Sequence, residues 1–351
     1  MISMLTYLHA IQIGVLLFFV FFLLSLIPYM IVQYRKYGRV NPWRFIVNFS
    51  FVLYIVCAYA MTIFPLPDVA QVAQMTGPKQ NLVPFEFVRQ FIAYNPLVLN
   101  DSSTWIMALK APSFIQPFFN LLLTLPFGIY LRYLFKRNFS QTLVWSFMLT
   151  LSFELLQRSA LFGLYPRPYR LFDVDDLMIN TLGSLLGFGI ACLLVKVLPD
   201  LDAKQAIPAQ IGMIRRSIAF GVDFVLANFL SNFVPHFYIA MLITFVGIPV
   251  LFGVTFGQKL LKIRIEGSRW KILSRQLLSF VNFGIVALLF YFLQRSSYIP
   301  QNELGQNFLM IVLSLILLLL PLLDILFATL SRTRKLWYER LSQTELSAKE
   351  I

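Results

Sequence analysis

The sequence predicts an all-α protein: a polytopic transmembrane helix bundle of about nine spans, with the N-terminus outside and the C-terminus cytoplasmic. Two observations predict it. The chain has 351 residues, of which 58% are hydrophobic and only 13% charged. Its apolar stretches of about 20 residues are each long enough to cross a ~30 Å hydrocarbon layer. The loops between them alternate between basic and nearly balanced charge, and basic loops of membrane proteins accumulate in the cytoplasm.

The predicted spans, in chain order, cover residues 8–32, 45–66, 117–135, 141–162, 176–198, 217–234, 236–254, 276–294 and 307–330. The first span lacks a basic leader and is too long for a signal-peptide core, so we interpret it as retained. The loop after it carries four basic residues without an acidic neighbour: Arg35, Lys36, Arg39 and Arg44. Loops of the same kind follow the third, fifth, seventh and ninth spans, which places this side of the bundle in the cytoplasm.

The basic loops also explain the net charge of +13, so we expect the lipid bilayer and no nucleic acid as a partner. Cys57 and Cys192 fall in separate apolar spans, and His9 and His236 are isolated. The sequence therefore predicts no disulfide framework, no metal site and no cofactor. No pattern predicts an oligomeric state.

Ionisable and polar residues interrupt the apolar runs between residues 152 and 189. A charged side chain within the bilayer costs at least ~2.5 kcal/mol unless it is paired or faces water. One helical face of the fourth span carries Glu154, Gln157 and Arg158. Residues spaced by three or four along the fifth span form a second face, namely Asp173, Asp176, Asn180, Gly183 and Gly187. Both faces begin at the same predicted outer boundary, so we expect them to meet in an outward-facing pocket.

These residues also have structural interpretations. Asp173 and, a turn deeper, Asp176 can cap a helix N-terminus. Glu154 can form a salt bridge with Arg158 or Arg170. The two glycines allow a second helix to approach closely.

The external segment between the second and third spans contains a stretch, residues 81–94, that favours a short amphipathic helix. Such a helix would lie at the membrane surface, either as an ordered cap or as a lid over a ligand. In the third span, Asn120 precedes a break at Pro126 and Gly128. A break there would free backbone carbonyls that need partners inside the protein.

Four motifs in this half of the chain resemble VanZ-like membrane proteins: NLVPF from Asn81, NLLLTLPFG from Asn120, ELLQ from Glu154 and RLFDVDDLMINTLGSLLG from Arg170. The resemblance extends over roughly the first 195 residues. It implies a bacterial, multi-pass protein of the cytoplasmic membrane with a role in the cell envelope. It also implies a link to low-level resistance to the lipoglycopeptide antibiotic teicoplanin, but it supplies no reaction.

A composition shift at residues 199–210 predicts a division into a five-span unit, residues 1–200, and a four-span unit, residues 201–351. RSIAFGVD from Arg216, TFGQKLLKIR from Thr255, Arg275 and Asp324 resemble the RDD family, a membrane domain named for an arginine and two aspartates. The resemblance points to Arg216, Asp223, Arg275 and Asp324. We expect the two aspartates to pair with Arg216 or Arg275, or alternatively to form an ion or proton path.

The sequence departs from the RDD pattern where Tyr338 and Glu339 occupy the place of a usual histidine–aspartate pair. Tyrosine does not titrate near pH 7 as histidine does. Any family activity that depends on that pair therefore does not transfer to this chain.

Three functions stay open at this point. In the first, the outward pocket binds an amphiphile, with Arg167 or Arg170 contacting phosphate or carboxylate. Its predicted ligand-binding residues are Glu154, Gln157, Arg158, Arg167, Arg170, Asp173, Asp176, Asn180, Asn120 and Asn81. In the second, a membrane enzyme acts on an envelope lipid, with Glu154 as general base and Asp176 stabilising a cation. In the third, an ion-coupled transporter uses Asp223 and Asp324.

Overall fold

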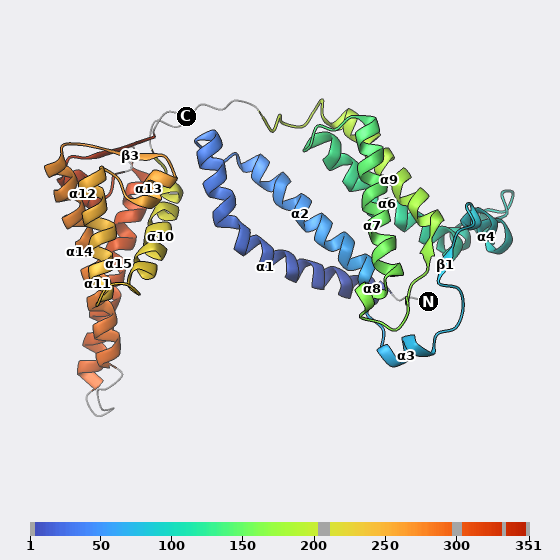
Figure 1. Ribbon diagram of the computed structural model, residues 1–351, viewed down its shortest axis with the longest axis horizontal. Helices are drawn as coiled ribbons and strands as arrows, with labels where there is room; N and C mark the ends of the chain where they lie inside the picture. Colours follow the sequence, from blue (N-terminus) through green and yellow to red (C-terminus); the bar gives the residue numbers. More distant parts are fainter. Residues whose placement is uncertain (1–3, 203–210, 297–303, 332–334, 349–351) are drawn as a thin grey trace. The chain divides into compact units, whose positions relative to one another are not determined.

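The computed structural model describes residues 4–202, 211–296, 304–331 and 335–348. It is 73% helical and forms two compact units (Figure 1). Unit 1 comprises Met1–Leu24 and Asn41–Lys204, and unit 2 comprises Ser25–Val40 and Gln205–Ile351. Residues 25–40, which the sequence analysis assigned to the first unit, group with unit 2, and the predicted division at residue 200 stays a prediction. That each unit carries the predicted number of spans stays a prediction.

Among the residues that the structure describes, five helices are long and apolar enough to cross a membrane. They are α1 (Met4–Tyr37), α2 (Pro42–Ile63), α6 (Pro112–Tyr133), α7 (Phe139–Arg158) and α9 (Val174–Leu194). The predicted all-α membrane bundle is thus confirmed in its fold class, whereas the count of nine spans and the N-out orientation stay predictions.

Helices α6 and α9 pack backbone against backbone in unit 1, with α7 beside them (Figure 1). A Cβ atom on Gly187 would lie 1.9 Å from the carbonyl oxygen of Leu125, and one on Gly183 would lie 2.2 Å from that of Leu121. Only glycine leaves room for this approach. The predicted packing role of both glycines is confirmed.

Pro126 lies inside α6 without interrupting it. A proline has no N–H to donate, which weakens the hydrogen bonding of the preceding turn. The Tyr54 hydroxyl donates to the Leu123 carbonyl in that turn, at 2.9 Å. The predicted break is therefore a proline within a continuous helix. The carbonyl that this proline leaves without a helical donor is that of Leu122, four residues earlier, so the partner expected for a freed carbonyl stays a prediction.

The external segment of unit 1 lies between α2 and α6. It contains α3 (Val69–Gln74), β1 (Gln80–Asn81), α4 (Glu86–Tyr94), η1 (Ser102–Thr104) and α5 (Trp105–Lys110). The predicted amphipathic helix is α4. Between α7 and α9 the chain forms α8 (Ala160–Gly163) and β2 (Phe172–Asp173). Strand β1 pairs in parallel with β2, with Asn81 opposite Asp173, and so fastens the external segment to the start of α9.

Unit 2 continues the chain with further helices and one antiparallel strand pair. The elements are α10 (Met213–Leu230), α11 (Phe237–Leu242), the π-helical turn η2 (Ile243–Gly247), α12 (Ile248–Phe252), α13 (Phe256–Leu260), β3 (Ile263–Glu266), α14 (Arg269–Ser296), α15 (Leu304–Leu330), α16 (Trp337–Leu341) and β4 (Glu345–Ala348). Strand β3 pairs with β4. A buried cluster of Ile211, Ala219, Leu261 and Ile263 packs against Ile31 and Tyr34 of α1.

Candidate functional site

Glu154 lies in the last turns of α7, and its side chain is buried, with only 2% exposed. One carboxylate oxygen accepts a hydrogen bond of 2.9 Å from the backbone N–H of Asp173. The charged groups that act on it most strongly are Asp176, Asp173 and Arg170. Among the described residues Glu154 has no ion pair, so the salt bridge to Arg158 or Arg170 considered from the sequence is not formed.

Asp173 caps α9, as the sequence suggested, because its side chain accepts a 2.9 Å hydrogen bond from the N–H of Asp175. The Asn81 amide donates to the same carboxylate at 3.3 Å. Burial raises the pKa of the Asp173 carboxyl, and these two hydrogen bonds partly oppose the rise. Asp173 therefore joins the external segment, the helix start and Glu154.

Asp175 is a site residue that the sequence reasoning missed. It is 3% exposed, and its two oxygens accept from the backbone N–H groups of Phe85 at 2.6 Å and Phe87 at 2.8 Å. It therefore fixes the start of α4, where Phe85 has a left-handed φ of 65°. Asp175 is off the helical face defined by Asp173 and Asp176, so a search by helical spacing passes over it.

Asp176 and Asn180 lie further along α9. The Asn120 amide donates to Asp176 at 2.6 Å, and the Thr124 hydroxyl donates to the Asn180 backbone carbonyl at 2.6 Å. Asp176 is thus bound by α6 and does not cap its own helix. The side-chain oxygen of Asn180 is buried and has no hydrogen-bond partner among the described residues. Because their faces begin at the same predicted outer boundary, the sequence predicts that Glu154, Asp176 and Asn180 contact one another. The hydrogen bonds of these residues run to Asp173, Asn120 and Thr124, and their mutual contact stays a prediction.

The arginines of the predicted pocket bind the external segment. Arg167 donates to the carbonyls of Met75 and Gly77, the latter at 3.0 Å. Arg170 donates to the carbonyl of Phe64 at 2.9 Å. Both side chains thus tie the loop before α9 to the segment that follows α2, and their contact with an anionic ligand stays a prediction.

The remaining predicted residues have similar roles. Arg158 donates to the side-chain carbonyl of Gln80 and lies over the ring of Phe172, 5.5 Å from its centroid. The buried Gln157 donates to the backbone carbonyl of Thr62 at 3.4 Å.

The result is an acidic cluster at the α4 end of the α6, α7 and α9 helices. Its carboxylates belong to Glu154, Asp173, Asp175 and Asp176, and backbone N–H groups and asparagine amides supply the hydrogen bonds to them. In the part of the chain that the structure describes, no three His, Cys, Asp or Glu side chains gather as a metal-binding group. The cluster can accept further hydrogen bonds from a ligand.

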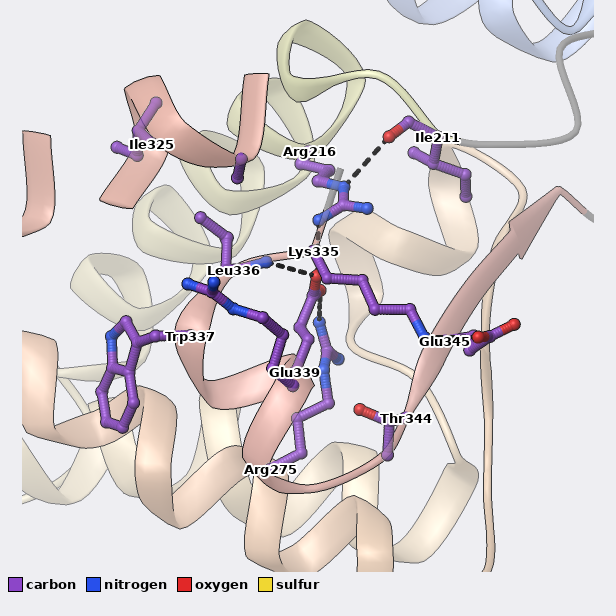
Figure 2. A network of polar contacts seen from close by, with 12 residues as sticks. Ile211, Arg216, Arg275, Ile325, Lys335, Leu336, Trp337, Glu339, Thr344 and Glu345 are labelled. Atoms are coloured by element: carbon purple, nitrogen blue, oxygen red, sulfur yellow. Dashed lines mark hydrogen bonds and ion pairs between the residues drawn. The ribbon is translucent and has the colours of Figure 1, made fainter. Parts of the chain in front are cut away.

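The residues singled out in unit 2 lie around one buried carboxylate. Arg216 and Arg275 reach Glu339 from opposite sides, each at 2.7 Å (Figure 2). Glu339 is 2% exposed and also accepts from the N–H of Leu336 at 3.0 Å. The sequence analysis named Glu339 only as a departure from the RDD pattern and missed this role.

The two aspartates of unit 2 bind other partners. Asp223 accepts from the Thr255 hydroxyl at 2.5 Å and from the Gly257 N–H at 2.6 Å. Asp324 pairs with Arg340 at 3.0 Å and accepts from the N–H of Trp337. The expected pairing of Asp223 and Asp324 with Arg216 or Arg275 is therefore wrong, because Glu339 takes both of those arginines.

A family model described as VanZ/LLP1 matches residues 51–195. This part of the chain is a VanZ-like domain. It contains α6, α7, α9 and the whole acidic cluster. Together with the five apolar helices, the match indicates a multi-pass membrane protein with a VanZ-like character. Comparisons with curated proteins and with solved structures found no match. The VanZ/LLP1 match covers no part of residues 211–348, whose resemblance to the RDD family stays a prediction.

Proposed function

We propose that the VanZ-like domain binds the polar head group of an amphiphile at the outer leaflet of the bacterial cytoplasmic membrane. The amphiphile is a lipid-linked wall precursor, a lipid head group or a lipoglycopeptide such as teicoplanin. The observation that carries the proposal is Glu154: a carboxylate only 2% exposed, held by one backbone N–H and without a cationic partner in the described chain. Burying such a group in its charged form costs free energy, which protonation of the carboxyl group or a bound donor can remove.

The chemistry of the cluster favours a head group that donates hydrogen bonds. Glu154, Asp173 and Asp176 present acceptors, whereas Arg167 and Arg170 are engaged with backbone carbonyls. Sugar hydroxyls and ammonium groups supply the donors that carboxylates accept. We therefore infer recognition through hydroxyl or ammonium groups, in place of the attraction of an anion to Arg170 expected from the sequence.

The proposal is tested with teicoplanin titrated into the full-length protein in lipid nanodiscs, followed by calorimetry. We expect Glu154→Gln to bind about 5- to 10-fold more weakly, because a neutral amide accepts hydrogen bonds less strongly than a carboxylate. Glu154→Ala removes the acceptor and should abolish measurable binding. Comparing the protein in nanodiscs with phosphatidylethanolamine and in nanodiscs with phosphatidylglycerol distinguishes recognition of an ammonium head group from recognition of a head group that carries only hydroxyls.

Glu86→Gln is the matched control, because Glu86 lies on α4 in the same unit and, within the described part of the chain, its ion pair is with Arg89, at 3.5 Å. It should bind as the wild-type protein does. If the wild-type protein binds neither teicoplanin nor one of these lipids, or if Glu154→Gln and Glu86→Gln behave alike, the proposed function is wrong.

The same substitution separates binding from catalysis. A glutamine at position 154 can still hydrogen-bond but cannot take a proton as a general base. In a teicoplanin-susceptibility assay at equal protein level, a binding protein should keep part of its effect with Glu154→Gln. An enzyme that uses Glu154 as its base should lose nearly all of it.

A further inference from the structure

Unit 2 contains a partly open cavity of about 330 Å³ beside the Glu339 ion pairs. Its walls are mainly apolar and include Phe220 and Phe245, while Arg275, Gln276 and Glu339 line it with polar groups. A space of this size holds a small amphiphilic molecule.

The polar lining has hydrogen-bond donors to spare. The Nε and Nη1 atoms of Arg275 and the Nε2 atom of Gln276 are buried and have no partner among the described residues. Arg275 is 3% exposed and Gln276 is 5% exposed. A buried donor without an acceptor costs about 1–3 kcal/mol, and more when it is charged. Three donor atoms of the lining therefore have no acceptor among the described residues.

The acidic side chains of the same lining do not accept hydrogen bonds from these three donor atoms. Glu339 accepts from Arg216, Arg275 and the N–H of Leu336. Asp223 accepts from Thr255 and Gly257. Asp324 accepts from Arg340 and the N–H of Trp337. Each carboxylate already has donors of its own, so the acceptor must come from outside the described residues.

We propose that this cavity binds an anionic amphiphile, with a carboxylate or phosphate group on Arg275 and Gln276 and a short apolar chain along the phenylalanine-lined wall. A guanidinium suits such oxygens because it offers several donors in one plane. The charges around the site balance, because Arg216 and Arg275 share Glu339, Asp324 pairs with Arg340 and Asp223 adds a third carboxylate. The attraction for an anion therefore rests on the unpartnered donors of Arg275 and Gln276. The site is separate from the acidic cluster of unit 1 and does not depend on the function proposed there.

The test uses four probes on the full-length protein in nanodiscs of uncharged lipid, each below the concentration at which it forms micelles. Decyl phosphate and decanoate carry the two anionic head groups. Inorganic phosphate carries the anion without a chain, and decyltrimethylammonium carries the chain with the opposite charge. Calorimetry gives the affinity, and the shift of the thermal unfolding midpoint gives a second readout.

Two substitutions act on the cavity by different means. Gln276→Leu removes one unpartnered donor, and Ser279→Leu fills part of the space with a larger side chain. Both residues line the cavity on α14. The matched control is Ser274→Leu, an exposed position of the same helix that does not line the cavity. The two substitutions act independently. If one of them lowers the yield of folded protein, the other still tests the proposal.

We expect decyl phosphate or decanoate to bind the wild-type protein and to raise its unfolding midpoint. Gln276→Leu should weaken binding by about 10-fold or more, since a hydrogen bond to a charged group contributes that much. Ser279→Leu should weaken it because the larger side chain takes up part of the cavity, while Ser274→Leu should not change it. Which of the two anions binds more tightly identifies the head group.

Four outcomes overturn the proposal. They are no binding of either chain-bearing anion, equal binding of decyltrimethylammonium, equal affinities of both cavity variants and Ser274→Leu, and inorganic phosphate that binds as tightly as decyl phosphate. The last outcome would mean that a free anion occupies the site and that the apolar walls contribute nothing.

Discussion

Each unit buries one glutamate to the same extent, but the two glutamates have different partners. Glu154 in unit 1 and Glu339 in unit 2 are both 2% exposed. Glu339 has ion pairs with Arg216 and Arg275. Glu154 has one backbone N–H, and its charged surroundings include Asp173 and Asp176. Removing a carboxylate should therefore damage unit 2 far more than unit 1. A buried carboxylate that the fold itself does not neutralise is the better candidate for binding something else.

The units also differ in what joins their elements. In unit 1 the closest packing is between the α6 and α9 backbones at Gly183 and Gly187. In unit 2 a side-chain network joins the start of α10, α14 and α16 through Arg216, Arg275 and Glu339. Unit 1 is therefore sensitive to added volume, and unit 2 to removed charge.

The largest effect should come from Glu339→Gln. It leaves the buried Arg275 and the half-buried Arg216 without their counter-ion, and breaking a buried ion pair from one side costs about 3–5 kcal/mol. Glu154→Gln should change the stability of unit 1 by less than about 1 kcal/mol, because the amide oxygen still accepts from Asp173 and no cation loses a partner. The comparison requires a readout for each unit.

The chain contains two cysteines, Cys57 and Cys192, both in helices of unit 1. Thermal unfolding followed by a thiol-reactive fluorophore therefore reports on unit 1. Ala227→Cys, at a fully buried position of α10, supplies the reporter for unit 2 when both native cysteines are replaced by alanine. Equal losses from Glu339→Gln and Glu154→Gln would contradict the difference drawn between the two carboxylates.

A smaller effect should come from Gly187→Ala. Its Cβ atom would lie 1.9 Å from the Leu125 carbonyl oxygen, so α6 and α9 must separate. Overpacking of this kind costs about 1–3 kcal/mol. Gly189→Ala is the matched control on the same helix, because its Cβ atom meets nothing within 4 Å. The native cysteines report the unfolding midpoint, and an equal midpoint for both variants would show that the close approach does not stabilise unit 1.

The sequence predicted those features that depend on length or spacing. The membrane-spanning helices were predictable because the thickness of the bilayer sets the length of an apolar span. The close packing at Gly183 and Gly187 was predictable because their spacing places them on one helical face. Asp173 was recognisable as a cap from its place before α9. Partners set by tertiary contact were not predictable. Glu339 lies 123 residues from Arg216, and backbone atoms such as the Phe64 carbonyl, which binds Arg170, leave no mark in the sequence.

The smallest effect should come from Tyr338→Phe, and it should appear only at alkaline pH. Burial raises the pKa of Tyr338 to about 12 from an ordinary value of 10, and the ring lies 5.5 Å from the Arg275 guanidinium carbon. The phenol loses its proton more easily in the unfolded chain. Its contribution to stability is therefore complete below pH 10 and is lost as the pH rises toward about 12. Phenylalanine keeps the ring and cannot ionise. The difference between the two unfolding midpoints of unit 2, measured with the Ala227→Cys reporter, should be near zero at pH 7 and should shift in favour of the variant above pH 10. A difference that does not change with pH would mean that Tyr338 is no better shielded from water in the folded protein than in the unfolded chain.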